Sequence, residues 1–342
     1  MSYLGNLALR LAGGALRLAE PLRRRHGDYL AGLQAGDGGF PGRQGAGDLY
    51  YTGFGLRGLA LLGRLDEPIA RRAAGFLHQR LGSCLATPLS GHRAAVGGRG
   101  VGGEGAEVCS QPLSAPMASI DLLSLVYSAV LLEVACGIDL FADAGMDRVR
   151  WVAASVEPLR RPDGGYAKSE RSGPSSTYYT FLTAACTELI GVPLDQPERI
   201  CEMVRRRQRD DGGFVELDAM RHSGTNPTAA AVGLLRLLDG LDEATASGAA
   251  GFLAQMQNVE GGLRANTRIP AADLLSTFTG LVALADLGVP ASVDRQQALQ
   301  YVTALERPEG GFRGALWDEA TDAEYTFYGL GARALLAGPD AG

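Results

Sequence analysis

Two carboxylates stand two residues apart in the stretch Asp322-Ala323-Glu324-Tyr325-Thr326, where an apolar helix is expected to begin. A carboxyl acts as a general acid when burial and neighbouring acidic groups keep it protonated. Glu324 is therefore a candidate acid, with Asp322 and Tyr325 tuning it. Alternatively, Asp322 and Glu324 could hold Mg²⁺. A third interpretation needs no catalysis, because Asp is a preferred N-cap and acidic residues in a first turn interact favourably with the helix dipole.

The same frame recurs at the starts of six apolar helices, aligned by a shared T/S-x-x-G-L pattern. The position of Asp322 is occupied in the other five by Asp48, Asp121, Ser176, Asn226 and Asp273. Two residues later stand Tyr50, Leu123, Tyr178, Thr228, Leu275 and Glu324, followed by Tyr51, Ser124, Tyr179, Ala229, Ser276 and Tyr325. Because equivalent helices start at equivalent places in a repeat fold, we expect all these residues at one end of the molecule.

The elements that position this frame form a repeat. An acidic-Gly-Gly-aromatic corner has its first glycine at residues 38, 164, 212, 261 and 310, and the last four corners are about 49 residues apart. An amphipathic helix precedes each corner, and a more apolar helix follows a polar loop. Since apolar helices belong inside and amphipathic helices outside, we predict an all-α fold, a closed α/α toroid of six helical hairpins forming one domain over residues 1–342.

The first gap between corners is longer than two repeats. A Gly-rich segment without periodicity, at about 82–117, accounts for the excess. We predict a long inserted loop there.

Composition excludes some classes of protein. The net charge is −6 and only 20% of residues are charged, so no nucleic-acid surface is expected. Five scattered cysteines without metal-type spacing indicate a reducing, cytoplasmic setting. No apolar run approaches the roughly 20 residues that span a bilayer. The Leu- and Arg-containing N-terminus is expected to be an amphipathic helix packed on the body, although a helix lying on a membrane surface is also possible.

The stretch "LQAGDGGFPGRQGAGDLYYTGFGLRGLALLG" (33–63) resembles the repeat of protein prenyltransferase β subunits and of squalene-type cyclases, and all six repeats fit. The resemblance implies a central apolar cavity for an isoprenoid and an α-subunit-like partner or a homodimer. Aromatic residues on the expected inner helices could wall such a cavity and stabilise a carbocation. They are Tyr50, Tyr51, Phe54, Tyr127, Tyr178, Tyr179, Phe181, Phe278, Tyr325, Phe327 and Tyr328.

The zinc site of the prenyltransferase β subunits is not expected. In that family, this frame supplies Asp and Cys from a DxC motif and a His from the next repeat, a donor set that suits Zn²⁺. Here the motif reads Asp48-Leu49-Tyr50 and Asp273-Leu274-Leu275, and Tyr325 stands at the His position. Asp48 and Asp273 remain the metal candidates, Mg²⁺ remains open, and the spacing of Cys84, His92 and Cys109 does not favour a substitute zinc site.

The cyclase resemblance concerns Asp322 to Thr326, a partial match to the DxDDT motif whose middle acid protonates an alkene or epoxide. It implies Glu324 as the acid. Arg43, in the GGFxGR motif, is implied to contact a diphosphate, although Ala46 replaces the family's companion Lys.

Three functions follow from this sequence. The first is a prenyltransferase β-like protein that binds a prenyl diphosphate or polyprene and transfers the prenyl group. The second is a class II terpene cyclase-like enzyme with Glu324 as acid, and the third is a non-catalytic binding or scaffold toroid. The substrate-binding candidates are Arg43, Asp48, Tyr50, Tyr51, Tyr178 and Tyr328.

Overall fold

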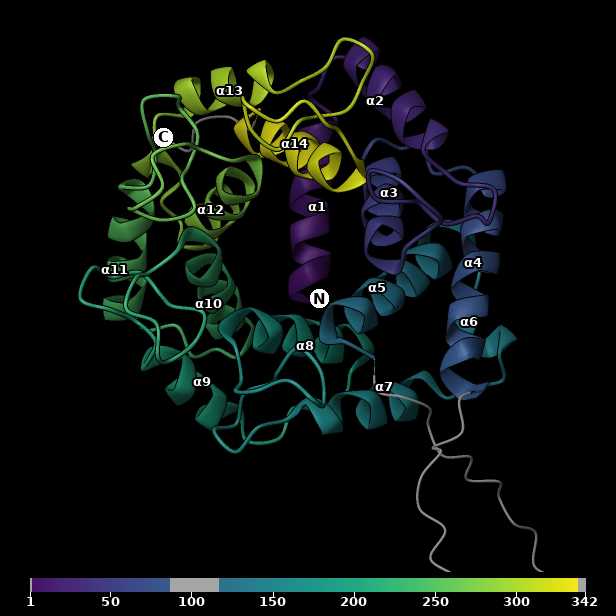
Figure 1. The fold of residues 1–342 in the computed structure, drawn as a ribbon, viewed down its shortest axis with the longest axis horizontal. Helices are drawn as coiled ribbons and strands as arrows, with labels where there is room; N and C mark the ends of the chain where they lie inside the picture. Colours follow the sequence, from purple (N-terminus) through teal and green to yellow (C-terminus); the bar gives the residue numbers. More distant parts are fainter. Residues whose placement is uncertain (1, 87–116, 338–342) are drawn as a thin grey trace, which may run out of the picture.

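A computed structural model describes residues 2–86 and 117–337, and within them the chain is helical, with isolated β-bridges and no strand. Six apolar helices form a closed inner ring in which each packs against the next and the last returns to the first (Figure 1). The inner helices are α3 (Leu49–Leu61), α5 (Ser119–Cys136), α8 (Thr177–Ile190), α10 (Thr225–Leu237), α12 (Leu274–Asp286) and α14 (Ala323–Leu336). The predicted all-α toroid is confirmed.

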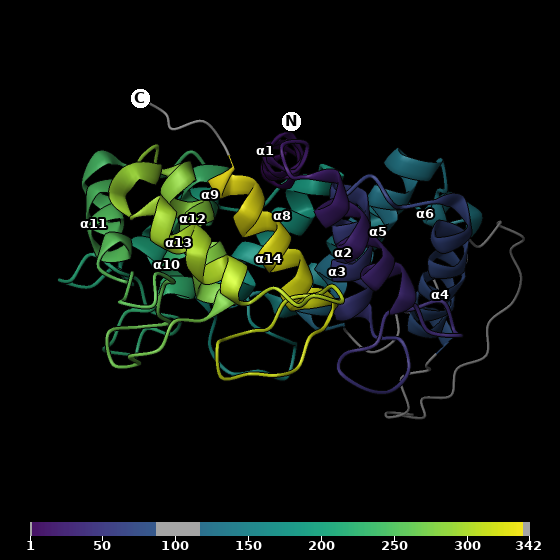
Figure 2. The ribbon, with the colours of Figure 1, turned by 90° about the horizontal axis from the view of Figure 1, so that it is seen from above.

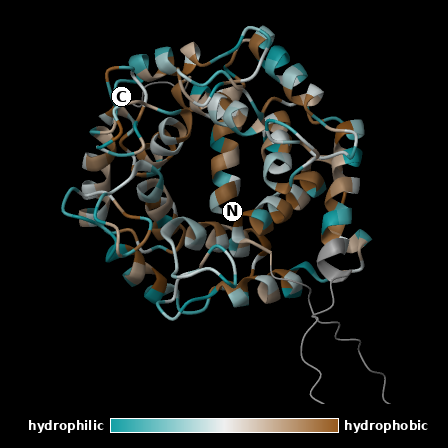
Figure 3. Cartoon of the chain, in the orientation of Figure 1, coloured by the Kyte–Doolittle hydropathy of each residue, from teal (hydrophilic) through white to brown (hydrophobic). Residues whose placement is uncertain are grey.

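An outer ring surrounds these helices (Figure 1). It consists of α2 (Glu20–Gly32), α4 (Glu67–Ala86), α7 (Arg148–Val156), α9 (Pro197–Arg205), α11 (Glu243–Ala254) and α13 (Arg295–Ala304), with short α6 (Leu140–Asp143), η1 (Glu157–Leu159) and η2 (Pro290–Ser292) between them. Hydrophobic residues gather on the inner ring and hydrophilic ones on the loops and outer faces (Figure 3). This distribution places the apolar core between the two rings.

The N-terminal helix α1 (Tyr3–Ala15) belongs to neither ring. It crosses one end of the ring, and the loops that carry the corners lie at the other end (Figure 2). Asp286, on α12, accepts hydrogen bonds from the Tyr3 hydroxyl at 2.7 Å and from Arg10 at 2.8 Å. Glu188, on α8, accepts from the Tyr3 backbone N–H at 2.8 Å. The N-terminal helix therefore packs on the body, as predicted, and closes one end of it.

Each corner depends on a glycine with backbone angles that other residues rarely adopt. Gly38 has a φ of 88° and Gly212 a φ of 82°. An added Cβ would lie 2.2 Å from a backbone carbonyl oxygen in both cases, that of Arg72 beside Gly38 and that of Gly248 beside Gly212. The corner glycines therefore permit both the turn and the close contact with the following outer helix.

A threonine in five of the six inner helices defines the true register of the repeat. The hydroxyl of each accepts the backbone N–H of the corner's last residue, at 2.9 Å in four repeats and 3.4 Å in the sixth; the threonines are Thr52, Thr180, Thr228, Thr277 and Thr326. Asp48, Ser176, Asp273 and Asp322 are N-caps, as the frame predicts.

The predicted frame is wrong in two repeats. Helix α10 is capped by Gly224 and α5 by Ala118, so Asn226 and Asp121 lie inside their helices. The correct alignment puts Asn226 two residues after the cap, level with Tyr50 and Tyr178. The error arose because neither true cap has a side chain that can accept a hydrogen bond.

The ring is closed by contacts between the first and last repeats. Fully buried His26, on α2, accepts the Gly311 backbone N–H through Nδ1 at 3.0 Å, and its Nε2 lies 3.2 Å from Glu306. The Tyr29 hydroxyl donates to Thr321 at 2.8 Å. We call these contacts, together with the packing of α3 against α14, the closure seam.

Among the helices of the described residues, one, α5, is long and apolar enough to cross a membrane by length and composition, with a mean hydropathy of 1.8. It packs between α3 and α8 in the inner ring, which accounts for its apolar character. Within the insertion expected at 82–117, residues 82–86 continue α4, and residues 87–116 lie outside the described residues. The proposed Cys84, His92 and Cys109 set lies outside the described side chains, and Cys136, Cys186 and Cys201 are free thiols.

Candidate functional site

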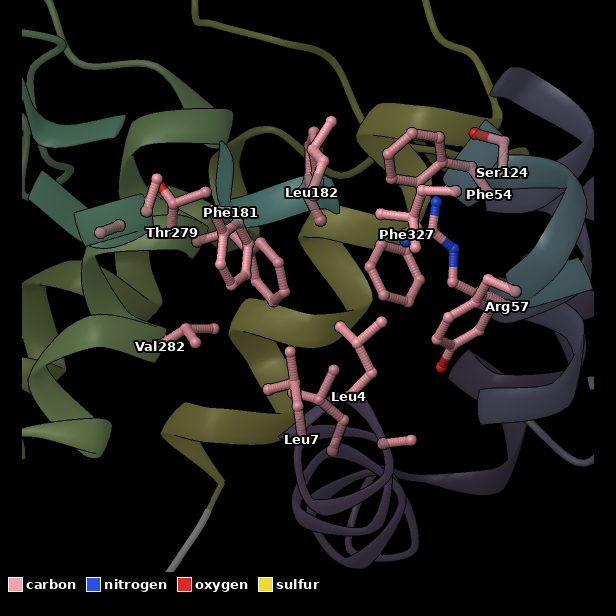
Figure 4. A pocket seen from close by; sticks show the side chains of 18 of the residues that line it. Leu4, Leu7, Phe54, Arg57, Ser124, Phe181, Leu182, Thr279, Val282 and Phe327 are labelled. Carbon is pink, nitrogen blue, oxygen red and sulfur yellow. The ribbon is translucent and has the colours of Figure 1, made fainter. Parts of the chain in front are cut away.

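A cavity of about 750 Å³ occupies the centre of the inner ring. Side chains of the inner helices form its walls, and Leu4 and Leu7 of α1 lie at its base (Figure 4). Nine of the eleven aromatic residues expected in the wall line it, and only Tyr51 and Tyr325 do not. The aromatic side chains therefore line an open cavity and do not fill it, whereas filled space would have favoured the non-catalytic scaffold.

The aromatic rings in the wall pack against one another. The ring of Phe54 contacts those of Tyr50 and Tyr328, with centroids 4.8 and 5.2 Å apart. Phe278 stacks on Tyr328 at 5.3 Å. Contacts of this kind fix the rings in place, and aromatic rings that line a cavity can stabilise positive charge there.

Glu324 lies at the closure seam beside this aromatic cluster. The hydroxyl of Tyr50, from the first repeat, hydrogen-bonds to Glu324 Oε1 at 2.5 Å. Burial raises the pKa of Glu324, and the nearby Asp322 raises it further, whereas the Tyr50 hydroxyl and the Arg57 guanidinium act in the opposite direction. Burial likewise raises the pKa of Tyr50. The pair is thus a buried carboxyl with a raised pKa, bonded to a hydroxyl that lines the cavity.

Asp322 and Arg43 form an ion pair outside the cavity lining. Asp322 is 2% exposed and accepts from the Tyr325 backbone N–H at 2.9 Å, while Arg43 Nε lies 3.6 Å from its other oxygen. Arg43 also bonds Asp318 at 2.5 Å. Two carboxylates therefore already compensate the charge of Arg43, which the sequence had suggested for a diphosphate.

The remaining frame residues have local structural contacts. Asp48 is exposed and accepts the backbone N–H groups of Tyr50 and Tyr51. Asp273 accepts from the backbone and the hydroxyl of Ser276. Burial raises the pKa of Tyr325 to about 12, and its ring packs against Gly314 and Tyr328.

This donor set does not fit the metals considered. Within residues 2–86 and 117–337, no three His, Cys, Asp or Glu side chains converge as a metal site. Zn²⁺ requires such a set, and the frame positions hold Tyr and Leu instead. One oxygen of Asp322 accepts a backbone hydrogen bond and the other faces the Arg43 guanidinium, while one oxygen of Glu324 is bonded to Tyr50. This pair therefore does not present the set of free carboxylate oxygens that Mg²⁺ prefers.

Two charged residues line the cavity, Arg57 and Glu216, and neither was expected there from the sequence. Arg57 follows Phe54 by one helical turn on α3. Glu216 comes from the fourth corner loop, and burial raises its pKa while hydrogen bonds from Ser176 and the Tyr178 N–H oppose the shift. The repeat frame describes only the first residues of the inner helices. It therefore gives no prediction for Glu216, which lies in a loop, or for Arg57, which lies deeper in its helix.

Comparison with known proteins gives a family and a curated relative. A profile of the prenyltransferase alpha-alpha toroid domain matches residues 125–339. The drimenyl diphosphate synthase of Streptantibioticus cattleyicolor is 32% identical over 186 residues, which are 50% of this chain and 34% of that protein. The chain thus matches only about a third of the length of this relative.

Solved structures are similar in fold. The Candida albicans protein geranylgeranyltransferase-I complexed with GGPP superposes with a TM-score of 0.69 at 14% identity, covering 92% of this chain and 91% of that one. A variant of the type II terpene cyclase MstE from Scytonema, in complex with geranylgeranyl dihydroxybenzoate, gives a TM-score of 0.56 at 12% identity, covering 97% and 98%.

Proposed function

The chain belongs to the prenyltransferase alpha-alpha toroid domain family, and on that premise we propose that it is a terpene cyclase-type enzyme that protonates an isoprenoid held in its central cavity. One observation carries the proposal: a buried carboxyl, Glu324, bonds to a cavity-lining hydroxyl, Tyr50, beside a wall of aromatic rings. A class II cyclase needs an acid that stays protonated and a surface that tolerates positive charge.

The first step transfers a proton from the Glu324–Tyr50 pair. When Glu324 carries the proton, the same 2.5 Å contact has the carboxyl as donor, and the hydroxyl hydrogen of Tyr50 is free to face the cavity. That hydrogen passes to an alkene carbon as the carboxyl proton passes to the Tyr50 oxygen. A C–H bond forms, the π bond breaks, and Glu324 is left as a carboxylate.

The resulting carbocation is attacked by the next alkene of the same chain, so a carbon–carbon bond closes a ring. Phe278, Tyr328 and Phe181 present aromatic surface to this cation. The final cation loses a proton to a base, for which we assign Glu216, a carboxyl in the cavity wall. Glu324 regains its proton from solvent before the next turnover.

Prenyl transfer to a thiol, the other activity considered, receives less support from these residues. The family's transfer chemistry uses a zinc-bound thiolate, and the frame positions offer Tyr50, Leu275 and Tyr325 where zinc ligands would stand. Proton-initiated cyclisation requires only groups that the described chain contains.

The test measures products from farnesyl diphosphate, geranylgeranyl diphosphate and squalene. We expect the wild type to cyclise at least one of them, and Glu324→Gln to lower that rate by about a hundredfold or more, because a general acid contributes on this order. Tyr50→Phe, which keeps the ring and removes the hydroxyl, should lower it too. Glu309→Gln, at an exposed position in the same repeat, should leave the rate unchanged.

Cyclisation by Glu324→Gln at the wild-type rate would rule out this acid. Transfer of the prenyl group to a thiol, with zinc present in the purified protein, would replace the proposal by prenyl transfer. The pH dependence gives a further check: the rate should fall as pH rises through the raised pKa of Glu324, because only the protonated carboxyl is active.

A further inference from the structure

Arg57 places a cation inside the cavity. Its guanidinium carbon lies 4.1 Å from the ring centroid of Phe54, 5.1 Å from that of Phe327 and 5.3 Å from that of Tyr127. Figure 4 shows Arg57 beside Phe54 and Phe327, on the opposite side of the cavity from Phe181 and Val282. Its Nε donates to the Gly53 carbonyl at 2.8 Å, which holds the planar group in place.

Unlike Arg10, Arg43 and Arg333, Arg57 makes no ion pair with a carboxylate of the described residues. Arg10 pairs with Asp286, Arg43 with Asp318 and Arg333 with Glu306. In the described parts of the chain, no carboxylate oxygen lies within 4.0 Å of the Arg57 nitrogens. Cation–π contacts contribute about 0.5–2 kcal/mol, and Glu324 interacts with Arg57 without forming an ion pair. The Arg57 guanidinium therefore remains able to pair with an anion inside the apolar cavity.

Side chains that carry hydroxyl groups lie near Arg57. Ser124 and Tyr127, one and two turns into α5, line the cavity with it. Ser128 Oγ is buried without a hydrogen-bond partner, and a Cβ placed on Gly53 would be 3.6 Å from both this oxygen and Arg57 Nη2. A guanidinium with nearby hydroxyl donors is the arrangement that recognises a phosphate or carboxylate.

We propose that Arg57 binds the anionic head group of the ligand inside the cavity, so that the ligand is an isoprenoid bearing a diphosphate or a carboxylate. The inference rests on the proposed isoprenoid function and defines its substrate class and orientation. The head group lies between α3 and α5, and the hydrocarbon chain extends toward the apolar wall of α8, α12 and α1. Phe54 and Phe327 face the Arg57 cation, so the carbocation forms near Phe278 and Phe181.

The experiment measures binding without turnover, by calorimetry on folded, full-length protein. The ligands are farnesyl diphosphate, farnesoic acid, the uncharged farnesol, and pyrophosphate alone. We expect the wild type to prefer an anionic farnesyl ligand over farnesol by about ten- to a hundredfold, the range that charge-assisted hydrogen bonds supply. Arg57→Met, which keeps the length of the side chain, should remove this preference and leave farnesol binding in place. Arg57→Lys should retain part of it.

Arg80→Met is the matched control, because Arg80 also stacks on a ring, that of Phe76 at 4.9 Å, but lies outside the cavity lining. It should keep the full preference. A preference that survives Arg57→Met, or that disappears in Arg43→Met instead, would overturn the proposal. Which anionic ligand binds more tightly identifies the head group.

The two proposals fail separately. If pyrophosphate binding depends on Arg57 but no farnesyl compound binds, the anion site stands and the isoprenoid function is wrong. If cyclised product forms while anionic and uncharged ligands bind equally, the function stands and the head-group site is wrong.

Discussion

The hydroxyl of Thr228 is the hydrogen-bond acceptor of a buried backbone N–H group in the fourth corner. It accepts the backbone N–H of Phe214 at 2.9 Å, and both residues are fully buried. A buried donor without a partner costs more than an average hydrogen bond contributes, because the donor has lost water as well. The repeated threonine is therefore a structural requirement of the corner.

Thr228→Val keeps the shape of the side chain and removes this acceptor. We expect the free energy of unfolding to fall by about 1–3 kcal/mol, measured by urea denaturation. Thr267→Val is the control, because Thr267 is exposed on the loop that follows the fifth corner. The control should change stability by less than about 0.5 kcal/mol. Equal effects of the two changes would show that the corner N–H finds another acceptor.

Helix α1, which closes one end of the cavity, packs closely against α14. An added Cβ at Gly14 would be 2.1 Å from the carbonyl oxygen of Ala334, whereas one at the adjacent Gly13 would meet nothing within 4 Å. The same helix thus contains one crowded glycine, Gly14, and one open glycine, Gly13. Comparing alanine substitutions at the two positions separates the effect of packing from the effect of helix propensity.

We expect Gly14→Ala to lower the melting temperature, because overpacking costs about 1–3 kcal/mol and would displace α1 from its contact with α14. Gly13→Ala should raise it slightly, since alanine is about 0.8–1 kcal/mol better than glycine inside a helix. Thermal unfolding followed by circular dichroism measures both. Stabilisation by both substitutions would mean that α1 is not packed as described.

The closure seam makes the intact ring sensitive to acid. Burial, together with the positive charges of the neighbouring Arg25 and Arg333, lowers the pKa of His26 from its ordinary value of 6.5 to about 3. Because Nδ1 accepts the Gly311 N–H, the neutral ring must carry its hydrogen on Nε2, facing Glu306. Protonation would place a second hydrogen against the Gly311 N–H and break this contact.

The unfolded chain therefore binds a proton at His26 before the folded chain does as pH falls. The free energy of unfolding should decrease from pH 6.5 toward pH 3, by at most about 1.4 kcal/mol per pH unit from this group. Denaturation at several pH values measures the slope. His26→Gln should reduce the slope, and His222→Gln, at an exposed site, should not. An unchanged slope in His26→Gln would assign the acid sensitivity to other groups.

Much of the fold was predictable from local features of the sequence. Corner glycines such as Gly38 and Gly212 mark the repeat because few other residues adopt their backbone angles. The contrast between apolar and amphipathic helices sorts them into an inner and an outer ring. Asp48, Ser176, Asp273 and Asp322 cap helices through contacts with residues two or three positions away. These properties depend on neighbours in sequence, so the sequence by itself determined the toroid and the aromatic character of its cavity.

The candidate site depended on residues that only the closed ring brings together. Tyr50 meets Glu324 across 274 positions in the chain, and Arg43 is captured by Asp318 across 275. Whether a cation is paired or free depends on which carboxylate lies beside it in space, so Arg57 and Arg43 could not be distinguished from sequence. The tertiary structure alone decided this, because charge compensation and burial are properties of the surroundings and not of the residue.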